Sequence, residues 1–329
     1  MMDAIAIGLG ELGRREATAL ADIDGVRIVG GADPAKNARS AFKADHDVPT
    51  YETHGKLLAK TDADLANIVT PHTLHYEAIK ACLERDIHVH VEKPFVTQID
   101  HGREVIDLAE KRDLVLAVGY QRHFDPRYRT IRELIDEGTI GKPHTVSCHL
   151  EQWWHEFAAN SWRGKRSLSG GGQLSDSGSH LLDAVLWTTR SEPTAVAAMV
   201  DDYGLDVDVN SALAATLDRD GTQITASISV SGAGQSTPAP GESIRILGSD
   251  GMIRFDGKTI HVTAEGETTT KQPKDIGFDE LTARKLQNTV DAIRGTADLQ
   301  IPAADGFAVT QLTLAAYEAA EGGHTVRFE

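Results

Sequence analysis

Residues 4–13 read Ala4-Ile5-Ala6-Ile7-Gly8-Leu9-Gly10-Glu11-Leu12-Gly13, a short apolar strand pattern followed by three spaced glycines. The spacing Gly-x-Gly-x-x-Gly after a strand, with a helix expected to begin there, is typical of a dinucleotide-binding turn. The first glycine allows a tight turn, the second allows close approach of a pyrophosphate, and the third allows close helix–strand packing. The N-terminus of the helix adds positive potential for phosphates. We therefore expect a dinucleotide site at the start of the chain.

Four further apolar runs follow and alternate with amphipathic, helical patterns: 26–29, 65–69, 87–91 and 114–118. Nearly continuous apolar runs are typical of parallel strands that are covered on both faces. Alternation of strands with helices is typical of a doubly wound α/β domain. The sequence predicts a Rossmann-type, dinucleotide-binding domain over residues 1–120.

The pattern changes after Gly119. A helix is expected at 126–136 and strands at 144–150, 194–200, 207–217, 222–231, 243–248 and 251–255, before two helices at about 279–294 and 305–320. Along 222–231, apolar residues alternate with small polar ones, which predicts a sheet with one face on a core. The other face is either solvated or meets a second subunit. We expect residues 121–329 to form an α+β domain for substrate binding and oligomerisation, with a large, mostly antiparallel open sheet.

The composition narrows the class of protein. The 329 residues carry a net charge of −16, which disfavours binding to nucleic acid or to anionic membranes. Apolar runs fall short of the ~20 residues that cross a bilayer. The two cysteines and the 14 histidines lack metal-ligand spacing, so we expect no metal. Free thiols and the absence of a signal-peptide pattern predict a cytoplasmic location.

Asp33 ends the second predicted strand, 20 residues after Gly13. A carboxylate there accepts hydrogen bonds from ribose hydroxyls and repels a 2′-phosphate, so NAD is favoured over NADP. Lys36 and Arg39 nearby keep NADP possible. The alternative is that Asp33 caps the next helix, whose first residue would be Pro34.

Two polar segments follow the third and fourth apolar runs, Thr70-Pro71-His72-Thr73-Leu74-His75 and Glu92-Lys93-Pro94. Ligands of parallel sheets bind at these strand ends. Lys93 is a candidate for chemistry at this edge. The alternative for Lys93 is a surface ion pair with Glu92.

A glycine run, Gly170–Gly172, leads to Asp176 and His180. In a helix, residues four apart share one face. A carboxylate beside an imidazole holds the ring in one tautomer and supports its charged form, as a general base requires. The pair is therefore a candidate catalytic element.

Taken in order, these segments resemble the glucose-fructose oxidoreductase/inositol dehydrogenase (Gfo/Idh/MocA) family over essentially the whole chain. The resemblance is carried by the glycine turn, Thr70-Pro71 with His75, Glu92-Lys93-Pro94, Gly119-Tyr120-Gln121-Arg122, Asp176 with Gly178 and His180, Asp305-Gly306 and Gly322-Gly323. It implies that Lys93 and His180 flank a reacting hydroxyl, with His180 as base, Asp176 orienting it, and Lys93 hydrogen-bonded to the developing alkoxide. Lys93 and His180 could exchange roles.

The resemblance also implies a wider site. The cofactor-binding candidates are Gly8, Gly10, Glu11, Leu12, Asp33, Thr70, Pro71, His72, His75, Glu92, Lys93, Gln121, Trp162 and Arg163. The substrate-binding candidates are Lys93, Arg122, Trp153, Trp154, Asp176 and His180. Core packing is the alternative for Trp162, and the Trp-rich segment 151–169 is either a specificity loop or an ordinary loop pinned by aromatic residues.

The implied function is hydride transfer to or from a sugar, inositol or related polyol, with NAD as cofactor and NADP as the alternative. One alternative is an NAD-dependent glycoside hydrolase that oxidises a sugar transiently and eliminates the aglycone. Another is a non-catalytic sugar or cofactor sensor, which would not need Lys93, Asp176 and His180. A homodimer or homotetramer formed through the C-terminal sheet is expected.

Overall fold

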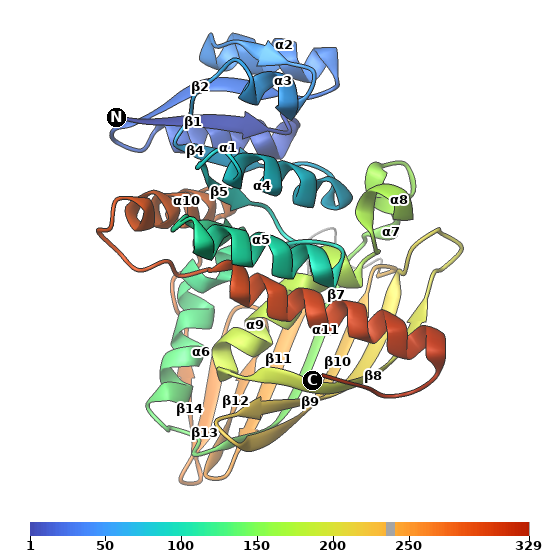
Figure 1. Cartoon of the computed structure of the whole chain (residues 1–329). Helices are drawn as coiled ribbons and strands as arrows, with labels where there is room; N and C mark the ends of the chain where they lie inside the picture. Colours follow the sequence, from blue (N-terminus) through green and yellow to red (C-terminus); the bar gives the residue numbers. More distant parts are fainter. Residues whose placement is uncertain (235–240, 329) are drawn as a thin grey trace. The chain divides into compact units, whose positions relative to one another are not determined.

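The computed structural model describes residues 1–234 and 241–328, which divide into two units (Figure 1). The first unit comprises Met1–Gln121 and Gly277–Phe307, and the second comprises Arg122–Ile276 and Ala308–Glu329. Each unit is built around its own sheet.

The first unit contains a six-stranded sheet with the order β3-β2-β1-β4-β5-β6, in which every pairing is parallel. This is the strand order of a doubly wound dinucleotide-binding fold, so the predicted Rossmann-type sheet is confirmed. The strands are β1 (Met2–Ile7), β2 (Val26–Ala32), β3 (Thr50–Tyr51), β4 (Leu65–Ile68), β5 (His88–Val91) and β6 (Leu116–Val118). The intervening helices are α1 (Glu11–Ala21), α2 (Lys36–His46), α3 (His54–Leu58), α4 (His75–Leu83) and α5 (Ile99–Lys111).

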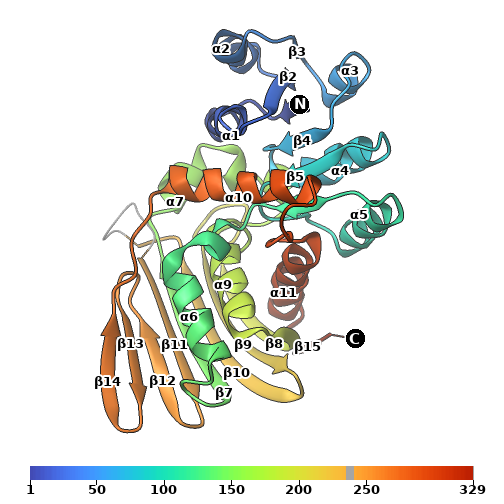
Figure 2. The same cartoon turned by 90° about the vertical axis from the view of Figure 1, so that its left-hand side faces the viewer.

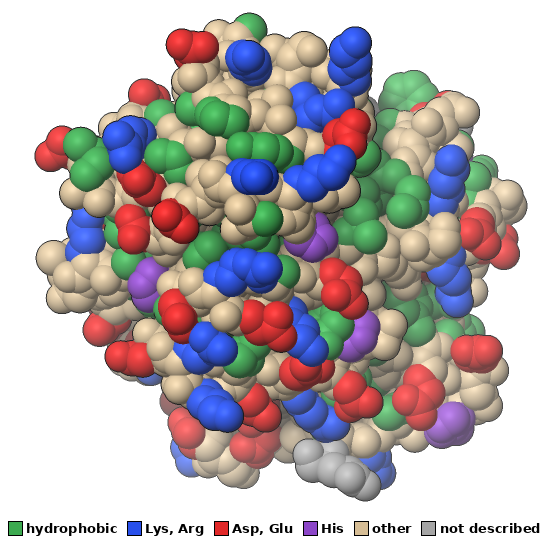
Figure 3. All heavy atoms as spheres, turned by 45° about the horizontal axis from the view of Figure 1, so that its top comes forward, with side chains coloured by type: hydrophobic (Ala, Val, Ile, Leu, Met, Phe, Trp, Pro, Cys, Tyr) green, Lys and Arg blue, Asp and Glu red, His purple; other side chains and the backbone are tan. Residues whose placement is uncertain are grey.

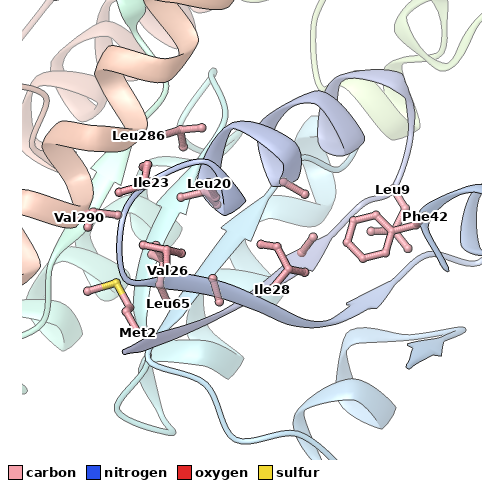
Figure 4. Packing of buried hydrophobic residues seen from close by; sticks show 13 residues of the cluster. Met2, Leu9, Leu20, Ile23, Val26, Ile28, Phe42, Leu65, Leu286 and Val290 are labelled. Carbon is pink, nitrogen blue, oxygen red and sulfur yellow. The ribbon is translucent and has the colours of Figure 1, made fainter. Parts of the chain in front are cut away.

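Residues 277–307 also belong to the first unit. The domain boundary predicted at residue 120 places them in the second domain instead. Their helix α10 (Phe278–Ile293) places Leu286 and Val290 in the same core as Leu20 and Ile23 (Figure 4). Beyond the helix, the N–H of Val118 in β6 bonds to the carbonyl of Ile301 at 3.1 Å. The amphipathic pattern of α10 predicts that one face is buried but does not say against which sheet.

The second unit contains a nine-stranded sheet with the order β14-β13-β12-β11-β7-β10-β9-β8-β15. All pairings are antiparallel except the parallel pair β7–β10, which confirms the predicted mostly antiparallel sheet. The strands are β7 (Pro143–Glu151), β8 (Glu192–Asp201), β9 (Asn210–Arg219), β10 (Thr222–Ser231), β11 (Gly241–Gly248), β12 (Gly251–Phe255), β13 (Ile260–Ala264), β14 (Glu267–Lys271) and β15 (Val326–Arg327).

Helices cover one face of this sheet. They are α6 (Pro126–Asp136), α9 (Ser179–Thr189) and, from Ala308 onward, α11 (Ala303–Gly322) (Figure 2). In β10, Ile224, Ala226, Ile228 and Val230 are buried, whereas the alternate residues are exposed. The predicted two-residue period is therefore confirmed.

The segment predicted as a loop over 151–169 contains two short helices, α7 (His155–Ala159) and α8 (Arg166–Ser169). Within the described ranges, no helix is long and apolar enough to cross a membrane. Acidic and basic side chains are interspersed on the face that Figure 3 shows.

Candidate active site

The glycine turn in the first unit has the geometry that a dinucleotide requires. Gly8 has φ +92°, and a Cβ on it would lie 2.1 Å from the carbonyl oxygen of Val69. A Cβ on Gly13 would lie 2.0 Å from the carbonyl oxygen of Gly8, so the helix must pack directly on the turn. A Cβ on Gly10 meets no atom of the described chain within 4 Å. The turn is thus open where a pyrophosphate would approach the N-terminus of α1, and the residues present fit a dinucleotide.

The Asp33 carboxylate ties the end of β2 to this turn. Its Oδ2 accepts the N–H of Leu9 at 2.9 Å, and its Oδ1 accepts the N–H of Ala35 at 2.7 Å. Helix α2 begins at Lys36, so the expectation that Pro34 is its first residue is wrong. The guanidinium of Arg39 donates to the carbonyl oxygens of Asp33 and Pro34, each at 2.8 Å. A carboxylate and a cation therefore both lie where the adenosine ribose is expected.

His75 links the loops that follow β4 and β5. Its Nδ1 is 2.9 Å from the carbonyl oxygen of Pro94, and its Nε2 is 3.0 Å from that of Thr70. The ring is fully buried, and this burial is the main reason that the pKa of His75 is lowered. The buried hydroxyl of Thr70 has no hydrogen-bond partner among the described residues, which leaves it available to a ligand. His75 therefore holds the loops that follow β4 and β5, and the Thr70 hydroxyl is the polar group that could bind a ligand.

The Glu92 carboxylate lies in a buried network rather than on the surface. It is hydrogen-bonded to Lys285 of α10, and its Oε2 accepts the N–H of Lys93 at 3.3 Å. Lys285 also contacts Glu16 Oε1 at 2.6 Å, and Glu16 accepts the side-chain N–H of Asn67 at 3.1 Å. The alternative from the sequence was a surface ion pair between Glu92 and Lys93. The structure instead pairs Glu92 with Lys285 in the interior.

In the second unit, Asp176 lies in a turn of π-helix, Leu174–Gly178, and not in the expected α-helix. The N–H of Gly178 bonds to the carbonyl of Gln173 at 2.8 Å. His180 then lies in the first turn of α9. Turns of this wide type occur frequently at functional sites.

The carboxylate of Asp176 is buried and accepts two hydrogen bonds at Oδ2. The indole N–H of Trp154 donates at 2.8 Å, and Nε of Arg163 donates at 3.0 Å. Trp154 is fully buried, so it supports Asp176 and has no exposed face for a sugar. Trp153 is 42% exposed, and half-buried Trp162 stacks under the Arg163 guanidinium at 4.4 Å. Of the three tryptophans in the segment, Trp153 thus has the most accessible ring.

Arg122 was predicted to bind substrate, but its guanidinium is paired with the Glu242 carboxylate. The hydroxyl of Tyr128 donates to the same carboxylate at 2.7 Å, and the Arg122 guanidinium lies 5.1 Å from the Tyr128 ring centroid. Arg122 therefore anchors the start of α6 to β11.

Asp208 organises the glycine run and was not predicted from the sequence. Its buried carboxylate accepts the N–H of Gly172 at 2.7 Å, the N–H of Leu174 at 2.8 Å and the hydroxyl of Tyr317 at 2.6 Å. A Cβ on Gly172 would lie 1.9 Å from the carbonyl oxygen of Asp208, so glycine is required there. Asp208 thereby fixes the start of the turn that carries Asp176.

The prediction that Lys93 acts with Asp176 and His180 stays a prediction, because Lys93 belongs to the first unit and the pair belongs to the second. The described residues include no group of three metal-ligating side chains that could hold an ion.

Two family models match the chain. The model "Oxidoreductase family, NAD-binding Rossmann fold" matches residues 3–120, and the "GFO/IDH/MocA C-terminal domain" matches residues 128–254. The rhizopine catabolism protein MocA of Rhizobium meliloti is 32% identical over 57% of this chain and 57% of its own length. A D-xylose 1-dehydrogenase [NADP(+)] of Haloarcula marismortui is 27% identical over 85% of this chain and 79% of its own.

The first two curated relatives are matched over only about half of their length, 57% and 43%. Among solved structures, a levoglucosan dehydrogenase in complex with NADH and levoglucosan has a TM-score of 0.88 at 20% identity, with 99% of each chain covered. Aldose-aldose oxidoreductase from Caulobacter crescentus has a TM-score of 0.84 at 21% identity, with 99% of each chain covered. These two likenesses concern the fold. The two family models, which together match residues 3–120 and 128–254, show that the chain belongs to the GFO/IDH/MocA oxidoreductase family and carries its NAD-binding Rossmann domain.

Proposed function

We propose that this protein is an NAD(P)-dependent dehydrogenase that oxidises a hydroxyl of a sugar, inositol or related polyol to a carbonyl. The observation that carries the proposal is that the first unit has both an open glycine turn at Gly8–Gly13 and a lysine, Lys93, just after the end of β5. Relatives named as D-xylose and scyllo-inositol dehydrogenases support the substrate class.

The chain's own residues divide the work of alcohol oxidation. When bound, the nicotinamide supplies the hydride acceptor, which no side chain can provide. Lys93 donates a hydrogen bond to the hydroxyl oxygen and stabilises its developing negative charge. His180 accepts the hydroxyl proton. Asp176 is held by Trp154 and Arg163. It orients the His180 ring and favours the charged imidazolium that forms.

We propose NAD as the preferred cofactor, because the Asp33 carboxylate lies at the end of β2 and would repel a 2′-phosphate. Arg39 beside it leaves NADP as a usable alternative. Two relatives are named as NADP(+) enzymes, so the activities with NAD and with NADP are to be compared directly.

We also propose that two or four copies associate through the exposed face of the nine-stranded sheet and work in the cytoplasm. The exposed residues of β10 are Gln223, Thr225, Ser227 and Ser229, which are uncharged and therefore cost less to desolvate than charged side chains. Light scattering should give a mass two or four times 35.5 kDa. A mass equal to the monomer would remove this proposal.

The function is tested by incubating the full chain with aldoses, inositols and sugar acids, with NAD or NADP. Formation of reduced cofactor with one substrate class supports the proposal. Aglycone release from a glycoside without net reduced cofactor would instead indicate the hydrolase mechanism, and binding without turnover would indicate a sensor.

A further inference from the structure

A buried cation lies between two carboxylates beneath the strand end that carries Lys93. The ammonium of Lys285 contacts Glu16 of α1 and Glu92 at the end of β5, and both its own side chain and that of Glu16 are at most 2% exposed. Removing a partner from such a pair leaves an uncompensated buried charge, which is strongly destabilising. Loss of Lys285 would therefore leave Glu16 and Glu92 as buried charges without a cation.

Glu92 is held from three sides. Its Oε1 bonds to Lys285, its Oε2 accepts the N–H of Lys93, and Gly119 packs over it so closely that a Cβ there would lie 2.3 Å from Oε1. The carboxylate is thus in direct contact with the Lys93 backbone. Lys285 is the only one of these contacts that carries an opposite charge.

Two more buried polar side chains, Asn67 and His90, extend the network from Glu16. Asn67 donates to Glu16 and its amide oxygen lies 2.8 Å from Nδ1 of His90. Burial, and next the positive charge of Lys285, lower the pKa of His90 to about 3, so that ring is neutral. The buried ring of His75 also feels the charge of Glu92, and burial lowers the pKa of His75 as well.

Lys285 itself remains charged. Burial acts to lower its pKa, but Glu16 and Glu92 outweigh burial and raise the pKa of Lys285 above its usual value. The formal charge of the cluster, two carboxylates and one ammonium, is −1.

We propose that Lys285 is a positioning residue for Lys93: its ion pair with Glu92 fixes the carboxylate that holds the Lys93 backbone. The link joins a helix near residue 285 to a strand end at residue 92 across 193 positions of sequence. The catalytic consequence rests on the proposed function, in which Lys93 contacts the reacting hydroxyl.

The test separates loss of this ion pair from loss of charge balance. Lys285→Met together with Glu16→Gln removes one positive and one negative charge, so the cluster keeps its single negative charge while Glu92 loses its cation. The parent protein is the control of equal cluster charge, and Glu16→Gln alone is the control that keeps the Lys285–Glu92 pair. Lys285→Arg supplies a cation that can still reach the carboxylates and should rescue.

Two measurements are made on the full chain. In the protein without cofactor, amide hydrogen exchange over residues 92–96 should be about tenfold faster in the double variant than in Glu16→Gln, because local opening becomes easier. In the active enzyme, kcat should fall about 10- to 100-fold in the double variant, with little change in KM for the cofactor, since Lys93 is misplaced. Glu16→Gln and Lys285→Arg should stay within about threefold of the parent protein, because the cation remains beside Glu92.

A double variant that folds, exchanges and turns over like Glu16→Gln overturns the proposal. Should the double variant fail to fold, Glu92→Gln breaks the same ion pair from the other side, and unchanged exchange at 92–96 in that variant also overturns it. If the parent protein oxidises no polyol, the proposed function fails, but hydrogen exchange still decides whether Lys285 holds this segment.

Discussion

Replacing Asp208 by Asn should destabilise the second unit strongly, because the carboxylate serves two sets of donors. One oxygen accepts the Gly172 N–H and the Tyr317 hydroxyl, at 2.7 and 2.6 Å. The other accepts the Leu174 N–H at 2.8 Å and the Ser211 hydroxyl at 3.3 Å. An amide has one oxygen, so its NH2 group must face one of the two backbone N–H groups.

The magnitude follows from this geometry. Loss of one hydrogen bond to a charged acceptor costs about 1.5–3 kcal/mol, and the buried N–H left without an acceptor adds about 1–3 kcal/mol. We therefore expect Asp208→Asn to lower the free energy of unfolding by about 2.5–6 kcal/mol. Tyr317→Phe removes one donor and leaves both backbone N–H groups satisfied, so it should cost only about 1.5–3 kcal/mol.

Urea unfolding of both variants and the parent protein measures these differences, with the midpoint and slope fitted separately. Under conditions where Asp208→Asn is fully folded, kcat should also fall by about tenfold or more, because the turn that carries Asp176 shifts. An Asp208→Asn protein within 1 kcal/mol of the parent, or no less stable than Tyr317→Phe, would refute this reasoning.

Three further predictions concern single side chains. Asp33→Ser should shift the ratio of kcat/KM for NAD over NADP towards NADP by about tenfold or more, since a like charge is removed from the ribose site; steady-state kinetics with both cofactors check this, and an unchanged ratio would show that Asp33 only closes the turn. His90 has its pKa lowered to about 3, mainly by burial, so the unfolded chain binds a proton that the folded chain does not as pH falls below 6.5. Stability should therefore drop by about 1.4 kcal/mol per pH unit between pH 6 and 4 on account of this residue, and His90→Gln should remove that part of the slope in urea titrations. Cys82 and Cys148 are buried, and burial raises both thiol pKa values, that of Cys82 to about 12; a disulfide reagent at pH 8 should label neither thiol in the folded protein and both after unfolding, whereas rapid labelling of the native protein would contradict the burial.

The local pattern of the sequence was sufficient for the sheets. The five apolar runs between residues 4 and 118 predicted the parallel sheet. The two-residue period at 222–231 predicted which face of β10 is buried. The predicted helix at 126–136 has the same bounds as α6. These features depend on neighbours in sequence, which periodicity records.

Contacts between distant segments were not predictable in the same way. The apolar face of α10 shows that the helix is buried, but not that Lys285 meets Glu16 and Glu92. The sequence predicts Trp154 as a substrate-binding residue, yet its indole is buried and donates a hydrogen bond to Asp176. A single sequence records which side chains are polar or apolar, while their partners depend on packing over long separations.

The π-helical turn at Leu174–Gly178 illustrates the same limit at short range. The sequence predicts a helix after the glycines with Asp176 inside it, but an i to i+5 hydrogen bond has no residue signature of its own. Asp208 and Tyr317 hold the start of this turn. Asp208 lies in the loop between β8 and β9, and Tyr317 lies in α11, so both are distant from the turn in sequence.

The central claim is that Lys93 serves hydride transfer from a polyol hydroxyl to a nicotinamide. The most direct measurement is the absorbance of reduced cofactor at 340 nm for the parent protein and for Lys93→Met, over the panel of aldoses, inositols and sugar acids. We predict reduced cofactor with the parent protein, a fall in kcat of at least about 100-fold in Lys93→Met, and nearly unchanged affinity for NAD. Turnover that is the same in both proteins, or no reduced cofactor with any member of the panel, would contradict the account.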